Sequence, residues 1–170
     1  MTRIIVCPLH DVDALIAIQR PSHIVSLMSP SARLDIDMSG HKADHLVLRF
    51  NDIAEPCKGL IAPDENHIRK YLDFLQSWDS TQPLLVHCWA GVSRSPAAAY
   101  IAMVQSQPEM TELDIARHLR AKAPHATPNR RIIEIADTLL AKSDRMSAAI
   151  ADIGRGSDTA WGSSFSLSGR

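Results

Sequence analysis

The sequence predicts an α/β domain with a central, mostly parallel sheet of four or five strands and helices flanking it on both faces. Short, β-branched apolar segments alternate along the chain with longer amphipathic segments, which is typical of parallel strands joined by crossover helices. The length of 170 residues corresponds to one ordinary domain. With 45% hydrophobic and 22% charged residues, the chain has a globular composition that argues against extensive disorder.

The predicted strands are short segments that are rich in β-branched and aliphatic residues and end at a proline or a polar turn. They are Arg3–Pro8, His23–Met28, His45–Phe50 and Leu84–His87. The last of them is apolar enough to be a central strand, because a strand covered on both faces shows no polar alternation.

The predicted helices are intervening segments whose apolar residues recur at helical spacing. The first opens at His10 and ends at Arg20, because Pro21 disfavours helical backbone in the residue before it. Pro96 lies in the first turn of another helix, where its missing N–H costs no hydrogen bond. The later helices are predicted over Asp64–Trp78, Ser95–Gln107, Thr111–Ala123 and Pro128–Met146.

The C-terminal residues differ in composition from the rest of the chain. From Gly154 to Arg170 they hold four of the seven glycines and five serines. We therefore predict one domain over residues 1–150 and a flexible Gly/Ser-rich tail over residues 151–170. Trp161 and Phe165 are then either a docking motif or part of a disordered end.

Charge, hydropathy and cysteine usage exclude several classes of protein. The 18 Lys and Arg nearly balance the 19 Asp and Glu, which excludes a strongly basic chain that binds nucleic acid through bulk charge. No apolar run approaches the ~20 residues that span a bilayer, and Met1–His10 lacks the pattern of a signal peptide. Cys7, Cys57 and Cys88 are odd in number and irregularly spaced, unlike a disulfide framework. We therefore expect a cytoplasmic protein without a nucleic-acid or membrane partner.

The turn that follows the fourth predicted strand carries the main chemical signal. It contains a glycine and leads directly into a helix, so it is predicted to direct successive backbone N–H groups inward and to bind an anion at the helix N-terminus. Gly91 allows a close backbone approach that a side chain would obstruct. The expected phosphate-binding residues are Trp89, Ala90, Gly91, Val92, Ser93 and Arg94.

Cys88 begins this turn, and it is the candidate nucleophile. Helix N-termini and nearby cations favour the thiolate form of a cysteine. The planar fork of Arg94 fits two phosphate oxygens at once, which a lysine would do less well. A thiolate and a bidentate arginine around one oxyanion predict phosphate transfer through a covalent step. Ser95 either hydrogen-bonds the sulfur and helps it leave, or serves only as a helix cap.

Loss of an alkoxide or phenoxide also needs a proton donor, and a positioned acid is worth ~10²–10⁴ in rate. Asp52 is the candidate acid, because it follows the third strand at the sheet edge where ligands bind in parallel α/β folds. Glu55 and Asp64 are rival acids, and Asp52 could instead cap a turn.

The order His87-Cys88, five residues, Arg94-Ser95 resembles the signature of cysteine-dependent protein tyrosine phosphatases, in their compact dual-specificity-like branch. The resemblance covers roughly residues 45–140. It includes Asp52 at the place of the family's general acid, and Thr127-Pro128-Asn129 resembles the family's Pro-Asn helix start.

The resemblance implies a phosphatase-like three-layer fold, with residues 1–150 as the catalytic domain, and a two-step hydrolysis that uses no metal or cofactor. Cys88 would form a phosphocysteine while Arg94 and the loop amides hold the phosphoryl oxygens. Asp52 would protonate the leaving oxygen and then activate water, and Ser95 would assist departure of the sulfur. His87 would tune Cys88 from the strand.

The implied partner is a phosphorylated protein or peptide, bearing phosphotyrosine with or without phosphoserine and phosphothreonine, and the protein is expected to be a monomer. Hydrolysis of a lipid, nucleotide or RNA 5′-phosphate is an alternative. So is a phosphate-binding module without turnover. A rhodanese-type sulfurtransferase uses a similar loop but would not require Asp52.

Two further clusters carry weaker signals. His41 and His45 are four residues apart, but no carboxylate motif accompanies them, so no metal site is predicted. Cys57 lies in the same predicted loop as Asp52, and a redox partnership with Cys88 is conceivable because such thiolates are oxidisable. Cys7 is expected in the core.

Overall fold

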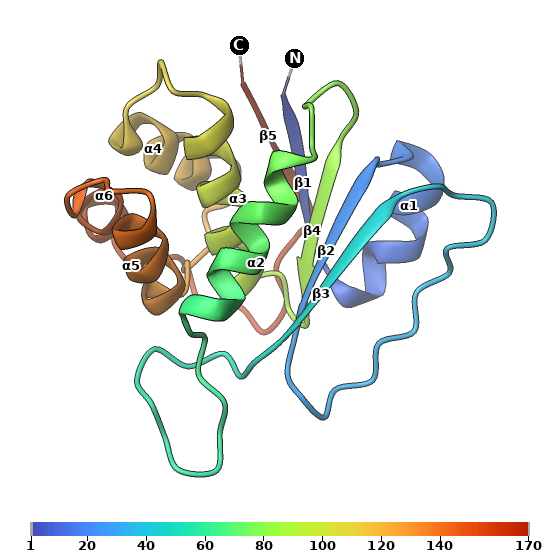
Figure 1. Cartoon of the computed structure of the whole chain (residues 1–170), viewed down its shortest axis with the longest axis horizontal. Coiled ribbons are helices and arrows are strands. Elements are labelled where there is room, and N and C mark those ends of the chain that lie inside the picture. Colours follow the sequence, from blue (N-terminus) through green and yellow to red (C-terminus); the bar gives the residue numbers. More distant parts are fainter. Residues whose placement is uncertain (1, 170) are drawn as a thin grey trace.

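A computed structural model describes residues 2–169 and shows a five-stranded sheet in the order β3-β2-β4-β1-β5 (Figure 1). The strands β1 to β4 are parallel, and β5 is antiparallel to β1. The predicted α/β class and mostly parallel sheet are therefore confirmed. The strands are β1 (Arg3–Pro8), β2 (His23–Met28), β3 (Asp44–Arg49), β4 (Leu84–Cys88) and β5 (Phe165–Ser168).

The helices form a layer on each face of the sheet. One face is covered by α1, whose Val12 and Ile16 pack with Ile24 and Leu85, and the remaining helices cover the other face (Figure 1). A short 3-10 turn, η1 (Leu9–Asp11), precedes α1. The helices are α1 (Val12–Gln19), α2 (Glu65–Gln76), α3 (Arg94–Ser106), α4 (Glu112–Lys122), α5 (Arg130–Leu139) and α6 (Arg145–Ile153).

The central strand β4 fixes the position of the candidate nucleophile. All five of its residues are buried, and it pairs with β2 on one side and β1 on the other. Successive side chains alternate between the two faces, so Val86 and Cys88 belong to the larger core while Leu85 belongs to the α1 side. The end of β4 therefore presents Cys88 to the face on which α3 begins.

The predicted last helix through Met146 is wrong, because the chain forms two helices there. Backbone with positive φ at Ala141, Ser143 and Asp144 interrupts it. The buried Asp137 carboxylate explains the break: it accepts hydrogen bonds from the backbone N–H groups of Asp144 (2.8 Å) and Ser147 (2.9 Å). These bonds satisfy donors at the start of α6.

The segment predicted as a flexible tail contains β5. Phe165 pairs with Val6, and Leu167 pairs with Ile4 and is fully buried. Because glycines and serines surround these two apolar residues, the sequence pattern did not predict this strand of only four residues. Its stability depends on the edge of β1, which supplies the missing backbone partners.

None of the helices within residues 2–169 has the length and apolar composition needed to cross a lipid bilayer.

Candidate active site

Cys88 lies at the carboxyl end of β4 with its sulfur enclosed by the following turn. Its exposed fraction is 2%. The backbone N–H of Gly91 donates to its Sγ over 3.3 Å, and Ser95 Oγ lies 3.1 Å from the same sulfur. The turn therefore wraps around the sulfur of Cys88, and its binding of an anion stays a prediction.

Gly91 is required where the turn meets β1. Its φ is +71°, and an added Cβ would lie 2.8 Å from the backbone nitrogen of Pro8 and 3.1 Å from the carbonyl carbon of Cys7. A side chain at this position would both strain the backbone and collide with a rigid strand. The close approach that Gly91 permits is thus to β1.

Carbonyl groups of the turn are held from outside by distant parts of the chain. Because the peptide group is planar and trans, a carbonyl fixed outward turns the N–H of the next residue the opposite way, toward the inside of the turn. Such bonds run from Leu9 N to Trp89 O (3.1 Å), from Thr127 N to Val92 O (2.8 Å) and from Asn129 N to Ser93 O (3.2 Å).

Arg94 is the first residue of α3 and is almost completely buried. Its Nη1 donates to the carbonyl oxygen of Phe50 (3.0 Å) and to Ser29 Oγ (3.2 Å), at the ends of β3 and β2. Its Nε is buried and has no hydrogen-bond partner among the described residues. An unpaired buried donor costs about 1–3 kcal/mol, so this guanidinium suits an anionic partner.

Asp52 is attached to the turn through two donors. Ser93 Oγ and Asn129 Nδ2 each donate to Asp52 Oδ1 over 2.8 Å. Asn129 in turn caps α5, since its Oδ1 accepts from the N–H of Ile132 (3.1 Å). The sequence signal at Thr127-Pro128-Asn129 marked a helix start, but the role of Asn129 in holding Asp52 was not predicted.

The rival acids have other partners. Glu55 forms an ion pair with Arg130 and is largely exposed. Asp64 caps α2, where its carboxylate accepts from the backbone N–H of His67 (3.0 Å) and the His67 ring accepts from the Asp64 N–H. Asp52 is the carboxylate that the structure brings to the turn.

Ser95 lies inside α3 and is completely buried. The N-cap position of α3 is Ser93, whose side chain makes no capping bond within the helix. The hydroxyl of Ser95 instead lies against Cys88 Sγ, and its assistance to the departing sulfur stays a prediction.

His87 lies beside Cys88 on β4 and is buried against Ser26 of β2. Its Nε2 is 2.5 Å from Ser26 Oγ, and the same hydroxyl is 2.8 Å from His45 Nε2. Burial lowers the pKa of His87 to about 4, so the ring is neutral at pH 7. The sequence predicted a buried supporting histidine here but gave no signal for Ser26 or His45 as its partners.

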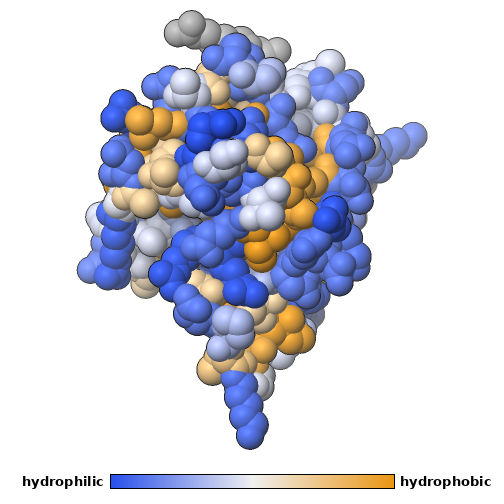
Figure 2. Space-filling model, turned by 60° about the vertical axis from the view of Figure 1, so that its left-hand side comes forward, coloured by the Kyte–Doolittle hydropathy of each residue, from blue (hydrophilic) through white to orange (hydrophobic). Residues whose placement is uncertain are grey.

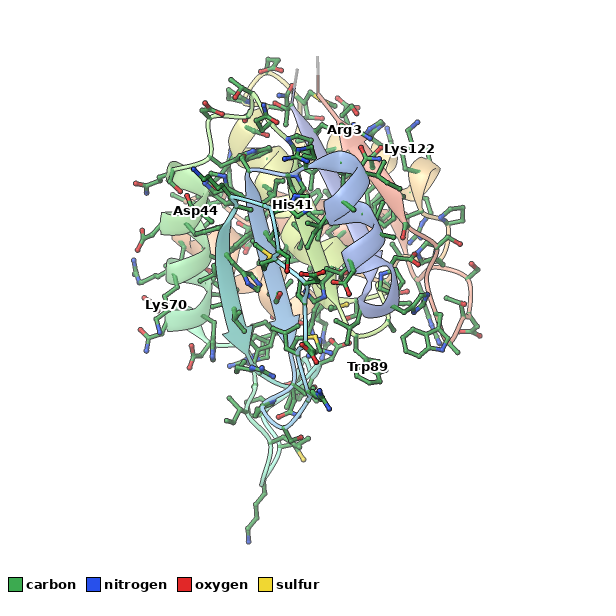
Figure 3. All side chains as sticks on the ribbon, turned by 90° about the vertical axis from the view of Figure 1, so that its right-hand side faces the viewer. Arg3, His41, Asp44, Lys70, Trp89 and Lys122 are labelled. Atoms are coloured by element: carbon green, nitrogen blue, oxygen red, sulfur yellow. The ribbon has the colours of Figure 1, made fainter. Side chains whose placement is uncertain are left out.

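Trp89 belongs to the turn, and its side chain points outward at the lower end of the sheet (Figure 3). About half of its surface is exposed. The centroid of its ring lies 5.9 Å from the centroid of the Trp161 ring. Trp161 also packs edge to face against the His10 ring, with 5.1 Å between the two centroids. Trp161 therefore lies beside the candidate site, and Phe165, considered with it in the sequence, belongs to β5.

The loop between β3 and α2 protrudes from the same end of the molecule (Figure 1). Leu60 and Ile61 of this loop are exposed, and Figure 2 shows hydrophobic surface near the lower tip of the molecule. Cys57 is exposed on this loop, and all three cysteines are free thiols. The redox partnership of Cys57 with Cys88 stays a prediction.

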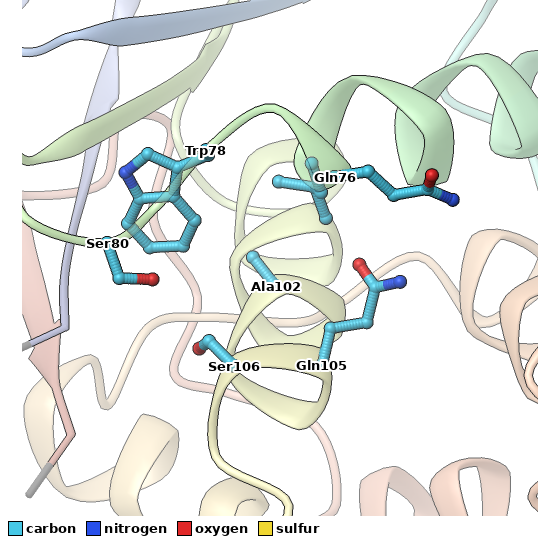
Figure 4. A pocket seen from close by; sticks show the side chains of 7 residues that line it. Gln76, Trp78, Ser80, Ala102, Gln105 and Ser106 are labelled. Carbon is cyan, nitrogen blue, oxygen red and sulfur yellow. The ribbon is translucent and has the colours of Figure 1, made fainter.

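Within residues 2–169, no three His, Cys, Asp or Glu side chains are grouped so as to hold a metal ion. A cavity of about 220 Å³ lies between the C-terminal parts of α2 and α3, and Trp78, Ala102 and Gln105 are among the residues that line it (Figure 4). None of the residues around Cys88 lines this cavity, so it is separate from the candidate site.

No protein-family model and no curated protein sequence matches the chain. Solved structures do match. The human tyrosine phosphatase-like serine/threonine/tyrosine-interacting protein is 16% identical, with a TM-score of 0.63 over 82% of this chain and 92% of that one. DUSP15 is 18% identical, with a TM-score of 0.60 over 88% of this chain and 90% of that one.

PTPMT1 in complex with PI(5)P is 15% identical, with a TM-score of 0.60 over 82% of this chain and 94% of that one. At such low identities the similarity concerns the fold, and a fold does not by itself define an activity. The chain has the fold of the dual-specificity and tyrosine phosphatases.

Proposed function

We propose that this protein is a cysteine-dependent phosphomonoesterase that acts through a phosphocysteine intermediate. One observation carries the proposal: the sulfur of Cys88 is within hydrogen-bond distance of Gly91 N and Ser95 Oγ, on a turn to which Asp52 is tied through Ser93. A nucleophile, inward amides and a carboxylate gathered at one anion-binding turn are the components of phosphoryl transfer to a protein group.

In the first step, the Cys88 thiolate attacks phosphorus and the ester P–O bond breaks. Inward N–H groups of the turn and the Arg94 guanidinium stabilise the negative charge on the transferring phosphoryl group. Asp52 donates a proton to the leaving oxygen. Both hydrogen bonds to Asp52 fall on Oδ1, which leaves Oδ2 to carry that proton.

In the second step, water attacks the phosphocysteine and the S–P bond breaks, which releases inorganic phosphate. The Asp52 carboxylate takes a proton from the water as it attacks. The Ser95 hydroxyl donates to the departing sulfur, with which it is already in contact at 3.1 Å. The proposed route involves no metal or cofactor.

The substrate that we propose is a phosphorylated protein or peptide, with phosphotyrosine as the main target and phosphoserine or phosphothreonine as further ones. The turn supports this choice because only Arg94 in it is charged; Trp89, Ala90, Val92 and Ser93 add no cation for a polyphosphate head group. We further propose that the protein acts as a monomer in the cytoplasm.

The proposal is tested with the full chain and a panel of substrates at matched concentrations: p-nitrophenyl phosphate, phosphotyrosine and phosphoserine peptides, a phosphoinositide and an RNA 5′-phosphate. We expect hydrolysis of the phosphotyrosine peptide. Exclusive turnover of the lipid or of the RNA would overturn the protein-substrate proposal.

The nucleophile is tested by Cys88→Ser, which should bind tungstate, a tetrahedral phosphate mimic, but lose turnover. Cys57→Ser is the matched control and should retain the wild-type rate. Full activity in Cys88→Ser would exclude the phosphocysteine route. A wild-type chain that binds tungstate and hydrolyses none of the panel would be a phosphate-binding module.

A further inference from the structure

The segment between α6 and β5, residues 154–164, crosses the outside of the anion-binding turn, and we call it the C-terminal strap. It is held at its first residues: Arg120 Nη2 donates to Gly154 O (2.7 Å), Gly156 N donates to Thr127 Oγ1 (3.0 Å) and Ser157 N donates to Pro124 O (2.9 Å). Its path is therefore fixed by the body of the domain before it reaches the turn.

The other end of the strap is held as well. Ser164 Oγ donates to the Asp11 carboxylate (2.5 Å), and the chain continues directly into β5, which pairs with β1. Because the segment is tied on both sides of the turn, its middle residues have little freedom to move away from it.

The middle of the strap makes one backbone contact with the turn: Gly162 N donates to Ala90 O over 2.8 Å. The carbonyl of Ala90 and the N–H of Gly91 belong to the same planar peptide group and point in opposite directions. That N–H is the one that donates to Cys88 Sγ at 3.3 Å. The strap thus fixes, from outside, the peptide whose donor faces the sulfur.

Gly162 leaves no room for a side chain at this contact. An added Cβ would lie 2.8 Å from the carbonyl oxygen of Gly91 and 2.6 Å from Nε2 of His125. Its φ does not lie in the left-handed region, so its only special requirement is this close approach. Any side chain here would push the strap away from the turn.

We propose that the C-terminal strap is a positioning element of the anion-binding turn, with Gly162 as its positioning residue. The inference rests on the proposed function for its biological meaning, because an ordered Gly91 N–H matters most when it faces a nucleophilic sulfur and a bound phosphoryl group. Its physical content, the order of the Ala90–Gly91 peptide, is measurable without turnover.

The test compares Gly162→Ala with the wild type. Hydrogen exchange of the Gly91 amide, followed by NMR, should become about 10-fold faster, because an open state that lacks the outer bond is more populated. Tungstate affinity, measured by calorimetry, should fall about 10-fold, as expected for loss of alignment of one donor to a charged group.

Gly169→Ala is the matched control. An added Cβ there would collide with the Gln107 side chain at the far end of β5, away from the turn. It loosens the C-terminal segment in general but should leave Gly91 exchange and tungstate affinity near the wild-type values. Ser164→Ala is a milder variant that removes the bond to Asp11 without a clash, and it should change both values in the same direction as Gly162→Ala, by about 2-fold to 3-fold.

Unchanged Gly91 exchange and tungstate affinity in Gly162→Ala would overturn the inference, and so would equal losses in Gly169→Ala. These results are independent of the proposed activity. A wild-type chain that hydrolyses no substrate, but in which Gly162→Ala still frees the Gly91 amide and weakens tungstate binding, would refute the function and support the strap. A chain that hydrolyses the substrates, but in which Gly162→Ala changes neither Gly91 exchange nor tungstate affinity, would support the function and refute the strap.

Discussion

Asn129 connects the start of α5 to the candidate acid Asp52, 77 residues earlier in the chain. Its side-chain oxygen caps the helix while its side-chain nitrogen donates to Asp52 Oδ1. Its backbone N–H donates to the Ser93 carbonyl, and Ser93 Oγ donates to the same Asp52 oxygen. One residue thus ties together the anion-binding turn, the acid loop and a helix of the core.

Replacement of Asp52 by Asn should slow loss of the leaving group while leaving phosphate binding intact. The expected decrease in kcat/KM, which reports the step in which the leaving group departs, is ~10²–10⁴ for phosphotyrosine, whose phenoxide needs a proton. It should be much smaller for an aryl ester with a more acidic phenol, which leaves without help. The measurement is kcat/KM across a series of aryl phosphates, because hydrolysis of the phosphocysteine, which also uses Asp52, is common to all of them and does not enter kcat/KM. Equal losses of kcat/KM along the series would contradict the role of Asp52 as the acid.

Asn129→Ala should reduce kcat more than its effect on stability explains. Loss of the cap of α5 costs about 1 kcal/mol of unfolding free energy, and Asp52 also loses one of its two donors. Thr111→Ala is the control, because Thr111 caps α4 by accepting from Asp114 N and makes no contact with Asp52.

The two variants are compared by urea unfolding and by kcat with the phosphotyrosine peptide. We expect similar destabilisation in both and a lower kcat only in Asn129→Ala. If Thr111→Ala loses as much activity, the effect of Asn129 is one of stability alone.

Gly91→Ala should destabilise the fold and abolish tungstate binding, because an added Cβ would press against the backbone of Pro8 at 2.8 Å. Gly40→Ala separates the collision from backbone strain: its φ of +73° is nearly the same as the +71° of Gly91, but no atom lies within 4 Å of an added Cβ.

The strain from a positive φ costs about 1–3 kcal/mol in either variant, and thermal unfolding measures the difference between them. We expect the larger loss in Gly91→Ala. Equal losses, with tungstate binding retained in both, would show that the turn accommodates the side chain.

The burial of His87 predicts a dependence of stability on pH. Because its pKa is lowered from 6.5 to about 4, the unfolded chain takes up a proton at a higher pH than the folded chain does. The unfolding free energy should therefore fall as the pH drops from about 6.5 to about 4, with a slope of up to ~1.4 kcal/mol per pH unit from this group.

Urea unfolding of the wild type and of His87→Asn between pH 7 and pH 4 checks this dependence. The variant is expected to be less stable at pH 7, since it disturbs the contact with Ser26, but to lose less stability on acidification. His23, His45, His118 and His125 have lowered pKa values too, so a reduced slope is expected and not a flat profile. Parallel curves would contradict the prediction.

The sequence by itself determined the features whose signals are local. The apolar strand before Cys88, the glycine in the turn and the helix after Arg94 lie within a few residues of one another, so their spacing predicted the turn that the structure shows. The four parallel strands were predictable for the same reason, since each is a continuous apolar segment. The position of Asp52 at the carboxyl edge of the sheet was also predictable, because parallel strands all end at the same edge.

Only the tertiary structure decided which distant groups meet. The contacts of Asp52 with Ser93 and Asn129 join segments 41 and 77 residues apart, and no periodicity in the chain encodes them. The strand β5 and the strap were missed because glycine and serine favour a flexible chain locally. Here the edge of β1 and the carbonyl of Ala90 supply backbone hydrogen-bond partners, and these hydrogen bonds outweigh the local preference.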